Sequence, residues 1–187
     1  MKYLQSGGFQ DKPLMRLTLG LALLLLAGFW ITNLALYFAH MGFDPASVVA
    51  YYRGSESEFM PPRSAQGMLE VTHMHLPMFA LVLLLLTHLL LFAPMRPAAK
   101  ATFIVVAFAS ALLSEAAGWM TRFWHPGFAL LKVAAFVIFQ GSLAFLILGL
   151  VGFLISGRRA PRHARRRHPR AHRDDSARIG GGGSGIQ

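Results

Sequence analysis

Three histidines in one apolar stretch are the residues of this chain best suited to do chemistry. His73 and His75 lie in the run Glu-Val-Thr-His-Met-His-Leu-Pro, and His88 follows fifteen residues after His73. On an α-helix that separation corresponds to about 60° of rotation and about 22 Å of rise, so His73 and His88 lie near one helix face at different depths. Imidazole binds metal ions and haem iron, and ionisable groups inside a membrane helix usually serve a function. The spacing therefore predicts a helix that carries ligands.

The chain has the composition of an integral membrane protein. Of its 187 residues, 55% are hydrophobic and 14% are charged. We expect four apolar spans long enough to cross a bilayer, at about residues 17–37, 71–93, 101–119 and 128–155. The predicted fold class is an all-α membrane protein, a four-transmembrane-helix bundle over residues 16–156. Because the chain has no cysteine, disulfides, thiolate metal sites, iron–sulfur clusters and covalent c-type haem attachment are excluded.

Basic residues flank the predicted spans unevenly. Lys12 and Arg16 precede the first span, Arg96 and Lys100 lie in the second loop, and the tail after the fourth span is rich in arginine. The positive-inside rule then places both termini in the cytoplasm and the loop 39–69 outside. We therefore expect a multi-pass protein of a bacterial inner (cytoplasmic) membrane, with this loop in the periplasm.

Residues 157–187 form a basic tail of low complexity that ends in a glycine-rich stretch. Such runs are usually disordered, and a basic cluster beside a membrane attracts anionic lipids. We expect no nucleic-acid partner, because the arginines are not interleaved with aromatic residues. A short N-terminal segment, residues 1–15, completes the predicted domain organisation.

The periplasmic loop carries sequence signals for a short helix. Asp44 is a favourable N-cap and Pro45 a favourable first residue, so we expect a helix that covers residues 46–52 and ends at Gly54. Ser64 is placed to cap the helix of the second span. The loop is either a lid over the outer end of the bundle or a docking surface for a periplasmic partner, and the sequence leaves both open.

Depth in the membrane decides which histidines can act together. Four of them gather near the outer boundary, namely His40, His73, His75 and His125, whereas His88 lies alone near the inner one. A low-spin haem b needs two imidazoles at one depth on facing helices, and His40 with His73 meets this requirement. His125 is the reserve partner, and His75 is the reserve ligand from the second span.

A second haem b would need another ligand beside His88 near the inner surface. This chain offers no histidine there. The second ligand would have to be Met15, Met95 or His88 of a second protomer. We therefore expect one haem b and leave the second open.

Further polar residues lie in the third and fourth spans. Glu115, Trp119 and Arg122 follow one another at i, i+4 and i+7, and Lys132 lies in the outer third of the fourth span. Glu115 and Lys132 are natural partners, because either charge alone in lipid is costly. Such a pair could simply fix the helix register. Alternatively, Lys132 or Arg122 could bind a haem propionate, or Glu115 could pass protons to a quinone.

The four-span layout, the entry to the second span through Glu-Val-Thr-His-Met-His-Leu-Pro and the following His88 resemble the small bacterial four-helix membrane cytochromes b. These form the broad cytochrome b561-like group, and the resemblance covers roughly residues 15–156. It implies b haems and electron transfer between the quinone pool and periplasmic or membrane redox partners. The residues that match the ligand pattern are His73 and His88, followed by His40, and the chain lacks an evident partner for His88.

Three functions are compatible with these residues. The first is a haem b electron-transfer subunit, a component with other membrane or periplasmic electron-transfer subunits as partners rather than a stand-alone enzyme. The second is a cofactor-free accessory subunit of a larger respiratory or photosynthetic membrane complex. The third is a channel, transporter or metal-handling protein, and the lack of a detectable inverted repeat counts against it.

Overall fold

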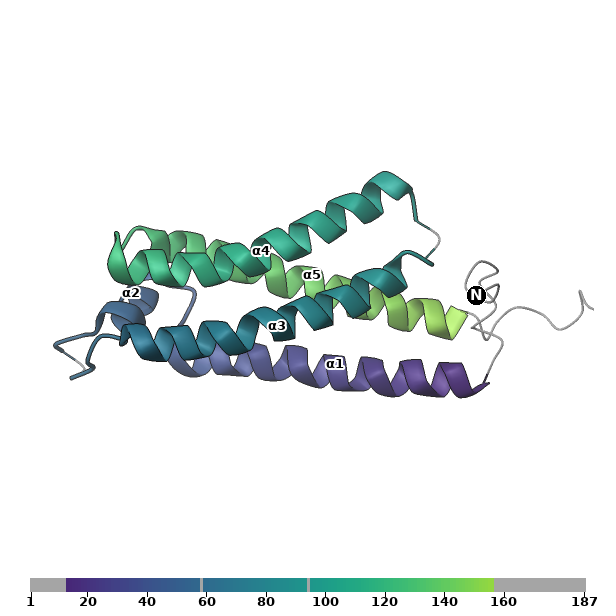
Figure 1. Cartoon of the computed structure of the whole chain (residues 1–187), viewed down its shortest axis with the longest axis horizontal. Helices are drawn as coiled ribbons and strands as arrows, with labels where there is room; N and C mark the ends of the chain where they lie inside the picture. The colour runs from purple at the N-terminus through teal and green to yellow at the C-terminus, as the bar shows by residue number, and fades with distance from the viewer. Residues whose placement is uncertain (1–12, 58, 94, 157–187) are drawn as a thin grey trace, which may run out of the picture.

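Four long helices and one short helix make up the bundle seen in a computed structural model of the chain (Figure 1). The structure describes residues 13–57, 59–93 and 95–156. The helices are α1 (Pro13–His40), α2 (Pro45–Arg53), α3 (Ala65–Leu90), α4 (Pro97–Phe123) and α5 (Phe128–Ser156). Each of the four long helices is long and apolar enough to cross a bilayer. The predicted fold class is thereby confirmed, and the side of the membrane on which each terminus lies stays a prediction.

Local capping signals set the ends of α2 and the start of α3. The Asp44 side chain accepts a hydrogen bond from the backbone in the first turn of α2, which begins at Pro45. Gly54 ends this helix with a φ of 86°, a backbone conformation that favours glycine. Ser64 caps α3 by accepting a hydrogen bond of 3.1 Å from the Gly67 N–H. These caps confirm the short helix predicted in the loop and the start of the next one.

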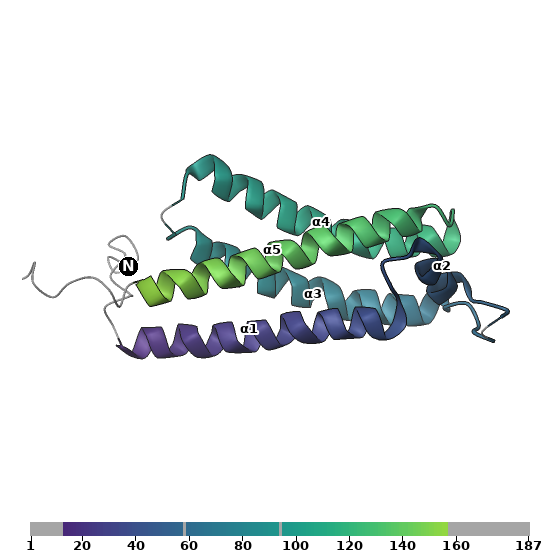
Figure 2. The same ribbon diagram turned by 180° about the vertical axis from the view of Figure 1, so that it is seen from behind.

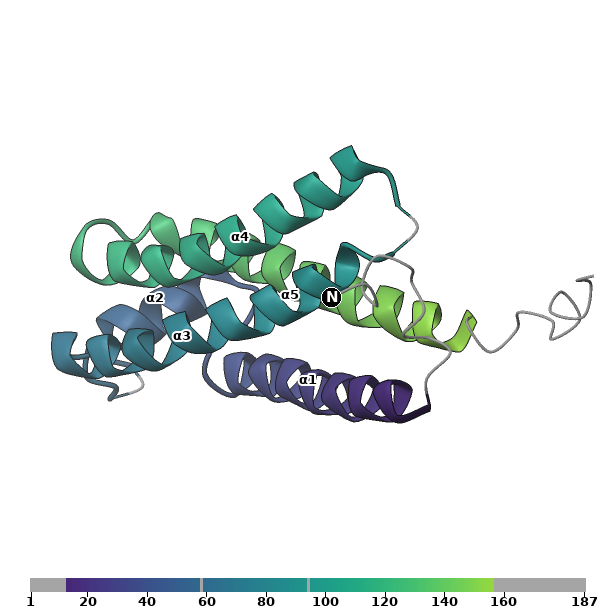
Figure 3. The ribbon, with the colours of Figure 1, turned by 45° about the vertical axis from the view of Figure 1, so that its right-hand side comes forward.

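Helices α4 and α5 form the most extensive helix pair of the bundle. The residues that α4 buries are all small: Ala107, Ser110, Ala111, Ser114, Ala117, Gly118 and Thr121. Small side chains let two helix backbones approach closely, which is how helices associate where lipid gives no hydrophobic driving force. The first turns of α4 diverge from the other helices, so the close pairing lies toward the end of α4 (Figure 3).

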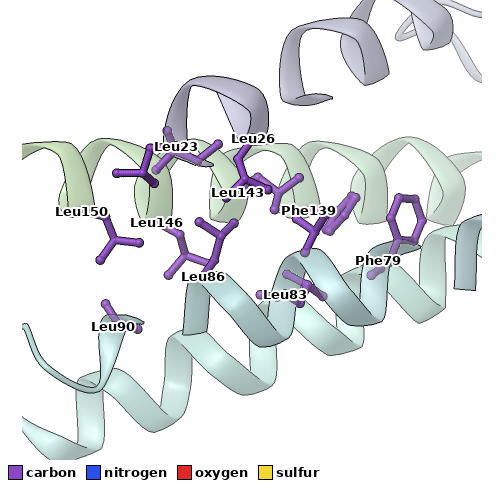
Figure 4. Close-up of a cluster of buried hydrophobic side chains, with 14 residues drawn as sticks. Leu23, Leu26, Phe79, Leu83, Leu86, Leu90, Phe139, Leu143, Leu146 and Leu150 are labelled. Atoms are coloured by element: carbon purple, nitrogen blue, oxygen red, sulfur yellow. The ribbon is translucent and has the colours of Figure 1, made fainter. Parts of the chain in front are cut away.

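An apolar core joins α1, α3 and α5 (Figure 4). Leu83 and Leu86 of α3 are nearly inaccessible, as are Leu143 and Leu146 of α5. Leu23 and Leu26 of α1 belong to the same cluster. This packing fixes the rotation of α3 about its axis, and the rotation decides which of its polar residues face the bundle.

The two ends of the bundle differ. Helix α2 lies at one end, where it contacts both α4 and α5, and we call this the α2 end (Figures 1 and 2). The opposite end, at which α1 begins and α5 finishes, is the terminal end (Figure 2). The predicted tail 157–187 and most of the predicted N-terminal segment, residues 1–12, lie outside the described residues.

Candidate functional site

A carboxylate–imidazole pair joins α3 to α4 near the α2 end. His75 Nδ1 lies 2.9 Å from Glu115 Oε1. The Glu115 side chain is 13% exposed and that of His75 is 40% exposed, so the pair leads from the bundle interior toward its surface. His75 also packs its ring on Phe79, with ring centroids 5.1 Å apart. A pair of this kind can hold a proton and pass it on.

Two further side chains extend this pair into a polar network. Trp119 Nε1 donates a 2.9 Å hydrogen bond to Thr72 Oγ1, and Thr72 Oγ1 lies 3.5 Å from Glu115 Oε2. Thr72 and His75 are three residues apart on α3, and Glu115 and Trp119 are four residues apart on α4, so each pair occupies one helix face. The network therefore consists of two facing polar stripes that fix α3 against α4.

The prediction that Glu115 and Lys132 pair directly was wrong. Lys132 is buried and donates hydrogen bonds to Ser114 O at 2.9 Å and to Ser114 Oγ at 3.0 Å. Glu115 is the next residue along α4 and so lies about 100° further around the helix, where it meets α3 instead of α5. Lys132 remains close enough for its charge to act on Glu115. Its ammonium is satisfied by the α4 backbone and a hydroxyl rather than by a carboxylate.

A pocket of about 440 Å³ opens beside the network at the α2 end. Thr72, Glu115 and Trp119 line one wall, and Tyr51 and Tyr52 of α2 also line the pocket. The remaining lining residues come from the segment before α3, from its first turns and from α4: Met60, Pro61, Pro62, Arg63, Ser64, Gly67, Met68, Val71 and Gly118. The pocket thus combines aromatic rings, apolar side chains and one carboxylate.

Tyr52 lines the pocket and packs against α4 at Gly118. A Cβ added at Gly118 would lie 2.7 Å from the Tyr52 hydroxyl oxygen, so the ring needs a glycine at this position. The pKa of Tyr52 is raised, first by burial of the phenol and second by the nearby Glu115 carboxylate. Tyr52 therefore stays a neutral hydroxyl group, able to donate or accept a hydrogen bond.

Two arginines hold the segment between α2 and α3 in place. Arg122 Nε donates a 2.8 Å hydrogen bond to the Arg63 backbone oxygen, and the Arg63 guanidinium lies 4.2 Å from the centre of the Tyr51 ring. Arg122, a predicted partner of a haem propionate, thus contacts a backbone carbonyl. Helix α2 contacts α4 and α5 at this end of the bundle, and whether the loop 39–69 acts as a lid or as a docking surface stays a prediction.

The histidines do not converge on this pocket. His73 and His40 are both exposed, and the ring of His40 lies beside Tyr51. His125 accepts a hydrogen bond from the Gly127 N–H and His88 packs edge-on against Phe92, and both are exposed. Of the five predicted ligands, His75 is the one that faces the bundle.

The cavities of the bundle do not bring the predicted haem ligands together. None of His40, His73, His75, His88 and His125 lines the pocket at the α2 end, and none lines a second cavity, a groove between the first turns of α1 and the last turns of α5 at the terminal end. In the described ranges, no group of three or more metal-binding side chains comes together. A haem b bound by His73 would therefore lie on the outward face of α3, and its presence stays a prediction.

One residue of the network, Thr72, was not singled out from the sequence. Thr72 precedes His73, and only the rotation of α3 shows that it shares a face with His75. Gln140 of α5 is buried, and its side-chain amide finds no partner among the described residues, although its backbone oxygen accepts a 3.1 Å hydrogen bond from Trp30 Nε1. The sequence already marks Gln140 as a polar residue two turns deeper than Lys132 in the fourth apolar span.

The fold and the site define a small multi-pass helical membrane protein with a polar network and a pocket at one end of its bundle. Residues 42–161 match the family model Aq_1264_TM, described as a transmembrane helical domain, and the chain belongs to this family. No curated protein and no solved structure matches the chain. The family match and the four apolar helices agree on a membrane protein.

Proposed function

We propose that this protein is an electron-transfer subunit of a bacterial inner membrane that binds a quinone or quinol head group in the pocket at the α2 end. The observation that carries the proposal is the position of Glu115. Its carboxylate lines the pocket and also contacts His75 at 2.9 Å. Oxidation of a quinol releases protons. A carboxylate in the pocket wall that contacts a more exposed imidazole can accept these protons and pass them toward the surface.

The walls of the pocket suit a flat amphipathic ring. Trp119, Tyr51 and Tyr52 supply aromatic surfaces for stacking, and the neutral Tyr52 hydroxyl can bond a quinone oxygen. The rest of the lining is mainly apolar, which favours a ligand that reaches the pocket from lipid. With the orientation that the basic residues predict, the pocket lies at the periplasmic boundary of the membrane.

Oxidation of a quinol to a quinone releases two protons and two electrons. Glu115 would accept the two protons from the head group one after the other, and His75 would carry each toward the surface, because the imidazole is the more exposed of the two groups. The two electrons would leave one at a time to a one-electron acceptor, the chemistry that haem b, which the sequence resemblance implies, would supply. His73 lies two residues from His75 on the outward face of α3, so it would offer its imidazole to a haem at a subunit interface.

A cofactor-free accessory subunit is the second candidate function. The observation that favours it is a row of exposed polar residues on the first turns of α3, formed by Gln66, Glu70 and His73. Gln66 and Glu70 already bond to each other at 3.1 Å, and no part of the row contributes to the pocket. Such a row would suit contact with another subunit.

Equilibrium binding of decylubiquinone to the protein in lipid nanodiscs tests the quinone proposal. Val71→Trp should abolish binding, since Val71 is an exposed residue of the pocket wall and a larger ring there fills the space. Leu69→Trp is the matched control, because Leu69 is exposed two residues away and does not line the pocket. Binding that is absent from the parent, or equal in parent and Val71→Trp, would overturn the quinone site.

An absorbance spectrum, oxidised and then reduced with dithionite, tests the haem separately. A Soret band that His73→Ala removes or converts to a high-spin form, and that His88→Ala leaves in place, would support a haem on the α2 half of α3. A protein purified gently from a haem-rich host without a Soret band would instead favour the accessory subunit.

A further inference from the structure

A groove at the terminal end of the bundle lies far from the candidate quinone pocket. It runs between the first turns of α1 and the last turns of α5 and has a volume of about 740 Å³. Arg16 is the one charged residue that the described part of the chain contributes to its lining. All other lining residues are apolar, including Ala27 on α1 and Ile147 and Leu154 on α5. The groove is therefore an apolar surface depression that faces lipid, with one basic side chain, Arg16, near one end.

The length of the groove matches one leaflet of a bilayer. From Arg16 to Ala27 the α1 axis rises about 16 Å, and half of the hydrocarbon core measures about 15 Å. Gly20 lies between them, and a Cβ placed there would meet no atom within 4 Å. The missing side chain thus keeps the floor of the groove open for an extended acyl chain.

The positive charge of Arg16 at the mouth of the groove favours an anionic head group. The ion pair found within the described residues, His75 with Glu115, involves neither Arg16 nor α5. Among the residues that the structure describes, no acidic side chain lines the groove. Basic sites between membrane helices are where acidic lipid head groups bind.

We propose that this groove is a binding site for an anionic phospholipid, with the phosphate at Arg16 and one acyl chain laid along Gly20 toward Ala27. With the predicted orientation, the lipid belongs to the cytoplasmic leaflet. The site would bring the lipid alongside both α1 and α5, which form one of the helix pairs of the bundle. A bound lipid would therefore stabilise the packing of α1.

Electron spin resonance of spin-labelled lipids tests the site with the full chain in phosphatidylcholine vesicles that contain a minor fraction of phosphatidylglycerol. The parent should immobilise labelled phosphatidylglycerol in preference to labelled phosphatidylcholine. Arg16→Gln should reduce this preference about fivefold, the weight of one basic residue near an anionic surface. Gly20→Leu should remove the preferentially immobilised fraction, because the leucine side chain would occupy the path of the acyl chain.

Gly28→Leu is the matched control for the groove. Gly28 lies on the same helix, a Cβ there also meets no atom within 4 Å, and it does not line the groove. The Gly28→Leu variant should bind phosphatidylglycerol as the parent does. Equal preference in parent, Gly20→Leu and Gly28→Leu would overturn the proposal. A parent that is dimeric in detergent and becomes monomeric on Gly20→Leu would also overturn it, because a second copy would then fill the groove.

Discussion

Replacing His75 by phenylalanine tests whether its imidazole stabilises the bundle through Glu115. Phenylalanine keeps a ring that can pack on Phe79 but cannot bond to the carboxylate. Glu115 would then keep its 3.5 Å contact with Thr72, on a side chain that is only 13% exposed. A carboxylate this buried cannot recover the lost bond fully from water.

The expected cost follows from the geometry of the pair. A hydrogen bond to a charged group contributes about 1.5–3 kcal/mol to the free energy of unfolding. The His75 side chain is 40% exposed, so water competes for the bond and screens the charge. We therefore expect the lower end of the range, about 1.5 kcal/mol, which is about a tenfold change in the unfolding equilibrium constant.

The assay is reversible unfolding in mixed micelles of dodecyl sulfate and dodecyl maltoside at neutral pH, followed by circular dichroism. In a Glu115→Gln background, His75→Phe should cost only about 0.5 kcal/mol, since a neutral hydrogen bond is lost. The resulting coupling of about 1 kcal/mol is measurable in a double-mutant cycle. Met74→Phe is the control, because Met74 is exposed and lies next to His75 on α3. Equal costs of His75→Phe in both backgrounds, or a cost no greater than that of the control, would refute the reasoning.

Three other predictions follow from the site and the charges. Gly118→Ala should destabilise the protein by about 1–3 kcal/mol through the contact with Tyr52, whereas Gly141→Ala, where a Cβ meets nothing within 4 Å, should be neutral or stabilising in the same unfolding assay. Burial raises the pKa of Tyr52 above its ordinary value of 10.0, so the phenol ionises at a lower pH in the unfolded chain than in the folded one. The free energy of unfolding should therefore fall as the pH rises past about 10, and Tyr52→Phe should show a flatter alkaline pH dependence. Cysteines at Ser57 and Ser176 test the orientation with an impermeant reagent on intact spheroplasts, where only Ser57→Cys should be labelled before lysis.

The helices of this protein could be predicted from its amino-acid sequence. The four spans follow from apolar runs long enough for a bilayer, and α2 follows from Asp44, Pro45 and Gly54, because capping is a local property of a few neighbouring residues. The sequence also identified Glu115 and His75 as polar residues that needed partners. Their partners could not be read from it.

Which polar side chains contact one another depends on how the helices pack. His73 and His75 point about 200° apart on a helix, and in a span that is apolar on all sides the hydrophobic pattern does not say which of them faces inward. Packing of α3 against α5 through Leu83 and Leu86 sets the rotation that turns His75 toward Glu115 and leaves His73 exposed. Side-chain pairing across helices depends on this rotation, which is a property of the packed bundle and of no single segment.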